Sequence, residues 1–122
     1  MISEEEKQRY EHPTFYGSGY IAVDFDFTLK KDISFNNPPI TKMLELVKYW
    51  MSLGIRVKIF TAKTTAQIPQ VKDWLNKYGI GSLEVTNLKI IGMRELWDDR
   101  AVTVIPNTGN SCCNYRRDLK IR

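Results

Sequence analysis

The chain has 122 residues, of which 43% are hydrophobic and 26% are charged, and its formal net charge is +4. This composition is typical of one soluble globular domain with a single core, and it excludes a fibrous or intrinsically disordered chain. The first residues lack the basic start and apolar run of a signal peptide, and no apolar stretch approaches the roughly 18 residues of a membrane span, so we expect a cytoplasmic protein without a membrane partner.

The N-terminal residues predict a short polar helix followed by a strand. Ser3 and Glu6 have the spacing of a capping box, in which each side chain accepts a hydrogen bond from the backbone amide of the other residue. Pro13 would end this helix. Residues 20–24 are almost continuously apolar until Asp24, which is typical of a strand buried on both faces of a parallel sheet.

Two amphipathic helices are predicted in the middle of the chain. Apolar residues recur at intervals of three and four over residues 40–51 and again over 68–78, and Gly54 and Gly79 stand where each helix would end. We expect the tryptophans and the tyrosine on these faces to pack in the core, because that role is far commoner for them than stacking on a base. The intervening residues 56–61 are predicted to form a second strand.

Further strands are predicted at residues 83–86, 95–97 and 101–105. The alternation of strands and helices indicates an α/β fold with a doubly wound, mostly parallel sheet flanked by helices. Ligands of such sheets bind at the carboxyl ends of the strands. The residues that close these strands are Asp24, Thr61 and the pair Asp98 and Asp99.

The C-terminal residues hold most of the excess charge. Four basic residues against one acidic residue give this segment a charge of +3: Arg116, Arg117, Lys120 and Arg122 against Asp118. A basic tail binds nucleic acid through phosphates, but it is more often a solvated chain end, so nucleic acid is only a weakly supported partner. Cys112 and Cys113 are adjacent, and a disulfide between neighbours is strained, which favours a reducing compartment.

Acidic residues are expected to converge at the carboxyl edge of the sheet. Asp24 and Asp26 stand two residues apart, so they project to the same side if the extended backbone continues through them. Two carboxylates about 4 Å apart repel each other by about 4 kcal/mol at an effective dielectric constant near 20, so a cluster with Asp98 and Asp99 predicts a bound cation. Oxygen ligands favour magnesium (Mg2+) over zinc or copper. Taken singly, each aspartate could instead be a turn residue or a helix cap.

The order of these residues along the chain resembles the haloacid-dehalogenase superfamily of phosphotransferases. The resemblance covers about residues 20–105 and rests on the segments IAVDFDFTL, VKIFTAK, VTNLK and ELWDDRAV. It implies a Rossmann-like core and one domain over residues 1–122. This domain would consist of an N-terminal helix and turn at 1–17, a catalytic core at 18–106 and the basic tail at 107–122.

The resemblance also implies roles for the first motif. Asp24 would be the nucleophile that forms an aspartyl-phosphate, Asp26 the general acid and base, and Thr28 a supporting residue that helps to bind phosphate. Phe27 stands where many members of the superfamily have glycine, which would narrow the entrance or change the substrate preference.

The later motifs would bind phosphate and metal. Thr61 matches the hydroxyl that binds the phosphoryl group. Lys89 is the expected lysine of the third motif, although Lys63 lies just after Thr61 and is an alternative for that role. Asp98 and Asp99 match the acidic fourth motif, and the resemblance implies that they bind magnesium together with Asp24 and Asp26.

The segment lengths bear on the substrate. The intervals from Thr28 to Thr61 and from Thr61 to Lys89 have room only for the predicted helices and loops, so no cap domain is expected. By resemblance to other capless members, the site would be open to a bulky phosphorylated partner, such as a nucleic-acid end, a nucleotide or a protein. An oligomer neighbour or the N-terminal helix could also cover the site around a small phosphate ester. Lys30 and Arg100 flank the site and would either guide a phosphate or be solvated.

The predicted function is a magnesium-dependent phosphatase that hydrolyses a phosphomonoester through an aspartyl-phosphate. A phosphatase of nucleic-acid ends or nucleotides is a more specific form of this hypothesis, and a non-catalytic protein that uses the same fold to bind phosphate or a partner is an alternative. A receiver domain uses similar residues, but by resemblance it would place a phosphorylated aspartate on a middle strand, before its threonine and lysine. Here Thr61 comes early and the second acidic pair comes last.

Overall fold

The computed structural model describes residues 2–11 and 19–111. The proline predicted to end the first helix, the cysteine pair and the basic residues of the tail lie outside the described residues. None of the helices in the described part of the chain combines the length and the apolar character of a bilayer-spanning segment.

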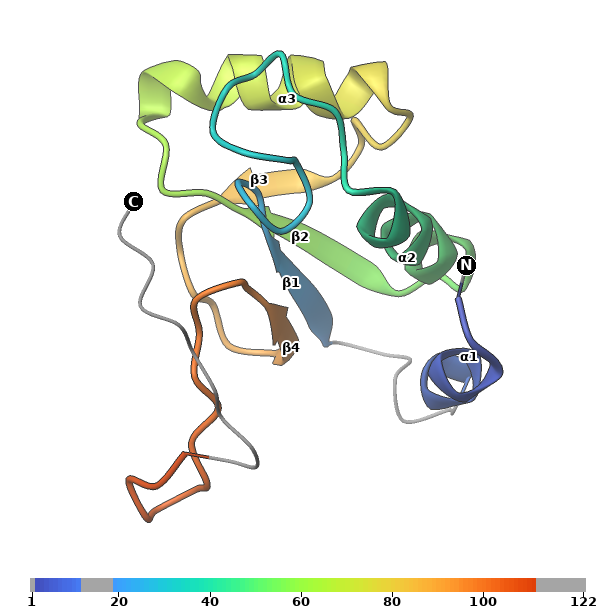
Figure 1. Cartoon of the computed structure of the whole chain (residues 1–122), viewed down its shortest axis with the longest axis vertical. Helices are drawn as coiled ribbons and strands as arrows, with labels where there is room; N and C mark the ends of the chain where they lie inside the picture. Colours follow the sequence, from blue (N-terminus) through green and yellow to red (C-terminus); the bar gives the residue numbers. More distant parts are fainter. Residues whose placement is uncertain (1, 12–18, 112–122) are drawn as a thin grey trace.

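A four-stranded sheet forms the centre of the fold, and all of its pairings are parallel (Figure 1). The strands are β1 (Tyr20–Asp24), β2 (Arg56–Phe60), β3 (Glu84–Thr86) and β4 (Met93–Trp97), and their order across the sheet is β3-β2-β1-β4. The chain therefore adds β2 and β3 on one side of β1 and then crosses back to add β4 on the other side. An α/β fold with a mostly parallel sheet is confirmed.

The helices are α1 (Glu4–Glu11), α2 (Thr41–Ser52) and α3 (Ile68–Lys77), with a short 3-10 turn, η2 (Thr65–Gln67), before α3. The capping box at the start of α1 is confirmed, because the Ser3 amide donates to Glu6 and the Glu6 amide donates to the Ser3 hydroxyl. Gly54 and Gly79 have positive φ angles of 79° and 81° just beyond α2 and α3, as expected of glycines that end helices.

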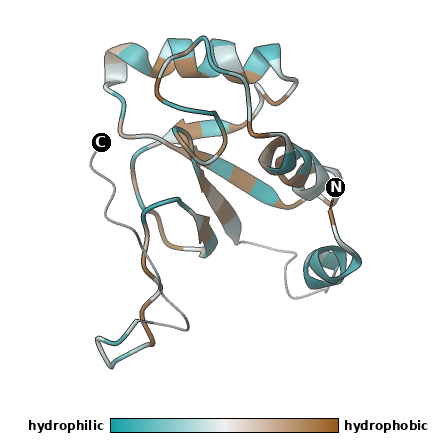
Figure 2. Cartoon of the chain, viewed as in Figure 1, coloured by the Kyte–Doolittle hydropathy of each residue, from teal (hydrophilic) through white to brown (hydrophobic). Residues whose placement is uncertain are grey.

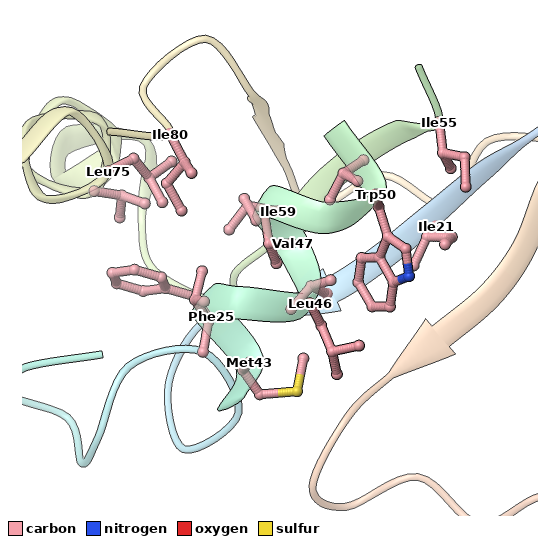
Figure 3. Close-up of a cluster of buried hydrophobic side chains, with 14 of the residues drawn as sticks. Ile21, Phe25, Met43, Leu46, Val47, Trp50, Ile55, Ile59, Leu75 and Ile80 are labelled. Atoms are coloured by element: carbon pink, nitrogen blue, oxygen red, sulfur yellow. The ribbon is translucent and has the colours of Figure 1, made fainter. Parts of the chain in front are cut away.

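In the described part of the chain, α1, α2 and α3 pack on the same face of the sheet. Ile21 and Val23 of β1 alternate with residues that face the other way, and they share one buried cluster with side chains from α1, α2 and α3. Figure 3 shows the part of this cluster between the sheet, α2 and Leu75 of α3. Trp50 of α2 is fully buried in this cluster, with its ring 5.3 Å from that of Tyr10 and 5.4 Å from that of Trp97. Figure 2 shows hydrophilic and apolar residues alternating along β2 and along α3.

The N-terminal helix places one aromatic residue in the core. Most of α1 is hydrophilic, but Tyr10 is buried in the core cluster. The Tyr10 hydroxyl donates a 2.8 Å hydrogen bond to Glu95 of β4, which also accepts a hydrogen bond from the Trp97 indole and pairs with Arg9. These contacts connect α1 to the edge strand of the sheet.

The second face of the sheet has no helix among the described residues, so the helices on both faces that define a doubly wound sheet are not seen there. Tyr20 and Ala22 of β1 are nevertheless buried on this face. The Tyr20 hydroxyl donates to the carbonyl of Ile90, which lies in the connection from β3 to β4, and the Lys58 ammonium lies 4.5 Å from the centre of the Tyr20 ring. The connection and a lysine thus cover part of the face.

The strand predicted at residues 101–105 is wrong. Val104 forms only an isolated antiparallel bridge with Ser111, and Val102, Val104 and Ile105 are exposed. The turn that follows explains the difference, because the Ile105 amide donates to the Asn110 carbonyl and folds the segment back on itself. The β-branched residues of this segment favour a strand, but the chain turns locally here. The segment therefore does not extend the sheet beyond β4.

We expect Leu46→Ala to lower the free energy of unfolding by about 2–5 kcal/mol, because Leu46 is fully buried between α2 and the sheet and its truncation leaves a cavity. Urea denaturation measures the effect. Lys48→Ala, an exposed position on the same helix, is the control and should change stability by less than about 0.5 kcal/mol. Equal denaturation midpoints for the two variants would contradict the placement of α2.

Candidate functional site

The parallel register brings acidic residues from two strands together. Val23 of β1 pairs with Trp97 of β4, so the next residues along each strand, Asp24 and Asp98, leave the sheet side by side. This position is at the carboxyl end of the sheet, between the two strands where the chain reverses its direction of winding. Such a switch point is where open α/β sheets bind ligands.

The Thr28 hydroxyl joins the two acidic segments. Thr28 is buried, and its hydroxyl donates a 3.3 Å hydrogen bond to Asp24 Oδ2 and accepts a 3.1 Å hydrogen bond from the Asp99 amide. The Asp98 carboxylate in turn accepts a 2.7 Å hydrogen bond from the Arg100 amide. The orientation of Asp24 and the path of the chain after β4 are thus set by neutral donors, which leave carboxylate oxygens for a ligand.

Three carboxylates form a group that could hold a metal ion. One oxygen from each of Asp24, Asp98 and Asp99 lies within 4.8 Å of the others, and Asp98 and Asp99 are exposed. Oxygens bound to one calcium ion are at most about 5 Å apart, and those bound to one magnesium ion at most about 4.2 Å, because the bonds are about 2.4 Å and 2.1 Å long. Rotation of the exposed Asp98 or Asp99 side chain would close the group around the smaller ion. The donor set therefore fits a hard divalent cation, and its spacing alone does not select magnesium.

The raised pKa of Asp24 also indicates that a cation is favoured at this position. Burial and, after it, the neighbouring carboxylates of Asp98 and Asp99 together raise the pKa of Asp24 to about 7, against the opposing effect of the Thr28 hydrogen bond. The ionised form of Asp24 is thus unfavourable near two other negative charges. A cation at this position would favour the carboxylate.

Asp26 does not join this group, so the predicted convergence of Asp24, Asp26 and Asp98 on one metal through their carboxyls is wrong. Asp26 Oδ1 lies 3.0 Å from the Lys30 ammonium, and Oδ2 lies 3.3 Å from the Lys63 ammonium. The prediction assumed an extended backbone. Instead the chain turns after Asp24, because the amides of Leu29 and Lys30 both donate to the Phe25 carbonyl.

Phe27 occupies an unusual conformation within this turn. Its φ angle is 68°, in the left-handed region that glycine adopts readily and a bulky residue adopts at a cost of about 1 kcal/mol or more. The Phe27 amide donates to the Lys30 carbonyl and closes the turn. The backbone thus has the shape that a glycine would favour at this position, although the residue is phenylalanine.

Of the phosphate-binding candidates, the structure places Thr61 and Lys63 near the first motif. Thr61 is buried directly after β2, and its hydroxyl accepts a 3.0 Å hydrogen bond from the Lys63 amide. The Lys63 ammonium pairs with Asp26 and lies 4.6 Å from the centre of the Phe35 ring. Lys89 is exposed in the connection between β3 and β4, and no ion pair joins it to the aspartates among the described residues.

Lys30 is a residue whose position the sequence did not indicate. It is fully buried, whereas a solvated or phosphate-guiding loop residue was expected. The sequence gives only a weak indication of this buried position. Lys30 lies four residues after Asp26, which is the spacing of a local ion pair in a turn or helix.

Three cavities of the fold lie away from the three aspartates. One of about 350 Å³ lies beside the starts of β2 and β3, one of about 230 Å³ lies between Phe35 and α3, and one of about 360 Å³ lies along β4. Asp98 and Asp99 are exposed, so the acidic group is at the surface at the edge of the sheet. Comparisons with protein-family models, with curated proteins and with solved structures find no match, so the functional argument depends on the geometry and chemistry of these residues.

The raised pKa of Asp24 predicts a pH dependence of stability in the presence of EDTA. In the unfolded chain Asp24 loses its proton near pH 4, whereas in the folded protein it keeps the proton until about pH 7. Stability should therefore fall as pH rises through this window, and Asp24→Asn should remove that part of the loss and be more stable than the wild type at pH 8.

Urea denaturation at pH 5 and pH 8 measures this difference. Asp73→Asn, at an exposed position on α3, is the matched control and should follow the wild type at both pH values. A wild type that is more stable than Asp24→Asn at pH 8 in EDTA would show that the negative charge of Asp24 is not unfavourable in the folded protein.

Proposed function

We propose that this protein is a phosphatase that uses a divalent cation, with magnesium the favoured ion, and hydrolyses a phosphomonoester through an aspartyl-phosphate on Asp24. The observation that carries the proposal is the group of Asp24, Asp98 and Asp99 at the switch point of the sheet, beside a second aspartate that is paired with lysines. The motif order that resembles the haloacid-dehalogenase superfamily supports the same function, with a Rossmann-like core.

Asp24 is the proposed nucleophile because it is partly buried, whereas Asp98 and Asp99 are exposed, and because the Thr28 hydroxyl holds its carboxylate. Its Oδ2 accepts from Thr28, so the other oxygen is available to attack phosphorus in line with the leaving group. A new bond forms between this oxygen and phosphorus while the bond to the leaving oxygen breaks. When bound to Asp24, Asp98 and Asp99, the cation would neutralise negative charge on the phosphoryl oxygens.

Asp26 is the proposed general acid and base. It lies two residues from the nucleophile, where a carboxyl can give a proton to the leaving oxygen and later take one from the water that hydrolyses the aspartyl-phosphate. Thr61 and Lys63 are the proposed ligands of the phosphoryl oxygens. Both lie near the first motif, and the Lys63 ammonium forms an ion pair with the Asp26 carboxylate, another anionic group.

The surface position of the acidic group favours an accessible substrate. The connection from β1 to β2 contains a loop and α2, and the connection from β2 to β3 contains η2 and α3, so neither contains a cap domain. A bulky phosphorylated partner, such as a nucleotide, a nucleic-acid end or a protein, could therefore approach the site. A second copy of the chain over the site would instead restrict it to a small ester.

Hydrolysis of an aryl phosphate tests the proposed function. We expect the wild type to release phosphate with magnesium and to stop when EDTA is added. Asp24→Asn should lower kcat by about 10³-fold or more, because the nucleophile is lost. Asp73→Asn is the matched control and should keep full activity. Magnesium-dependent hydrolysis that is unchanged in Asp24→Asn would contradict the assignment of the nucleophile, and binding of magnesium without turnover of aryl or oligonucleotide phosphates would favour a non-catalytic protein.

A comparison of two lysine variants decides which lysine binds phosphate. We expect Lys63→Met to lower kcat/KM by about 10²-fold or more, as is typical when one donor to a developing negative charge is removed. Lys89→Met removes an exposed lysine and should change kcat/KM by no more than about twofold. A larger loss of kcat/KM in Lys89→Met than in Lys63→Met would assign phosphate binding to Lys89. It would also mean that the β3–β4 connection moves towards the site when substrate binds.

A further inference from the structure

Lys30 is a buried cation with an unusually complete set of partners. It is 0% exposed, and lysine is almost never fully buried unless it is paired. Its ammonium lies 3.0 Å from Asp26 Oδ1 as an ion pair, and it donates hydrogen bonds to the carbonyls of Asp32 and Ser34, the latter at 2.9 Å. The ammonium also lies 5.4 Å from the centre of the Phe25 ring. The ammonium thus has one ion pair and two hydrogen bonds to oxygens.

These partners belong to two parts of the chain. Asp26 belongs to the first motif, whereas Asp32 and Ser34 belong to residues 31–38, the first part of the connection from β1 to α2. This loop is also attached at other points: the Lys31 amide donates to the Pro38 carbonyl, and the Trp74 indole donates to the Asn37 carbonyl. Lys30 therefore connects the loop to Oδ1 of the Asp26 carboxyl.

The two lysines on Asp26 differ in how they are held. Lys30 contacts Oδ1 and is enclosed by the loop. Lys63 contacts Oδ2, and its other polar contact is one long hydrogen bond, at 3.4 Å, to the Ile33 carbonyl. Lys63 would thus exchange one ion pair and one long hydrogen bond for a phosphoryl oxygen, whereas removal of Lys30 would leave a carboxylate oxygen and two carbonyls without their cation.

We propose that Lys30 is a positioning residue, whose buried ammonium fixes Oδ1 of Asp26 against the loop of residues 31–38 and so leaves Oδ2 as the oxygen that meets the substrate. This inference rests on the proposed function, in which Asp26 is the acid and base. Lys30 itself contacts neither the acidic group nor the phosphoryl site among the described contacts, and it acts through the orientation of Asp26. A base whose position is set by a fixed partner transfers protons more efficiently than one that rotates freely.

Lys58 offers a matched control within the same protein. It is also a buried lysine, at 7% exposure, and its ammonium pairs with Glu84 at 3.1 Å and lies over the Tyr20 ring. It is located in the middle of β2 on the second face of the sheet, and its partners belong to neither the first motif nor the loop. Lys58→Met therefore reports the general effect of removing a buried lysine.

The experiment compares Lys30→Met with Lys58→Met at a temperature where both variants are folded. We expect Lys30→Met to lower kcat of aryl phosphate hydrolysis by about 10–100-fold, as is usual for loss of a group that orients a reacting residue, with KM nearly unchanged. Lys58→Met should keep kcat within about twofold. An equal loss of kcat in both variants, or a Lys30→Met variant with the wild-type kcat, would overturn the proposal.

Amide hydrogen exchange separates this inference from the proposed function, because it needs no turnover. Lys30→Met should accelerate exchange in residues 31–37, and Lys58→Met should not. If the wild type hydrolyses no phosphate, the proposed function fails, and unchanged exchange in this loop would overturn the positioning role independently. If Lys30→Met does not fold, Asp26→Asn takes its place: it removes the charge that Lys30 binds and should accelerate exchange in the same residues, and the absence of that change would overturn the connection.

Discussion

The parallel pairing of β1 with both β2 and β4 is the constraint on which the rest of the structure depends. Because β1 is central, its side chains are buried on both faces, and its carboxyl end meets the ends of two neighbouring strands. The pairing of Val23 with Trp97 places Asp98 beside Asp24, although 74 positions separate them in the chain. A shift of one residue in this register would turn Trp97 away from the core and separate the two acids.

The same geometry creates an unfavourable concentration of charge. Asp24 is partly buried beside two exposed carboxylates, and its neutral contact with Thr28 does not compensate for them. Asp26, in contrast, has a lysine on each oxygen. The site therefore has two parts. The group of Asp24, Asp98 and Asp99 carries excess negative charge and favours a cation, whereas the charge of Asp26 is compensated by the two lysines beside it. This division suits phosphoryl transfer, in which a metal ion and an ammonium group approach the same phosphate from different sides.

The parts of the fold that follow from local patterns were predictable. The apolar run before Asp24, the helical spacing before Gly54 and Gly79, and the capping box of Ser3 and Glu6 all depend on residues close in sequence, and the structure confirms them. Residues 101–105 have the composition of a strand, but the backbone turn that joins Ile105 to Asn110 folds this segment back on itself, and composition does not reveal that turn. The candidate site also contains features that were predictable from the sequence and features that were not. The closing residues of β1 and β4 could be anticipated, whereas the turn that directs Asp26 towards Lys30 depends on backbone hydrogen bonds to Phe25 and on a strained Phe27.

The central claim is that Asp24 becomes covalently phosphorylated during turnover. The most direct measurement is mass spectrometry of protein that is mixed with an aryl phosphate and magnesium and then quenched in acid, which preserves acyl phosphates. We predict a mass gain of one phosphoryl group on the peptide that contains Asp24, and none when EDTA is present. Turnover without this adduct, or an adduct on another residue, would contradict the account.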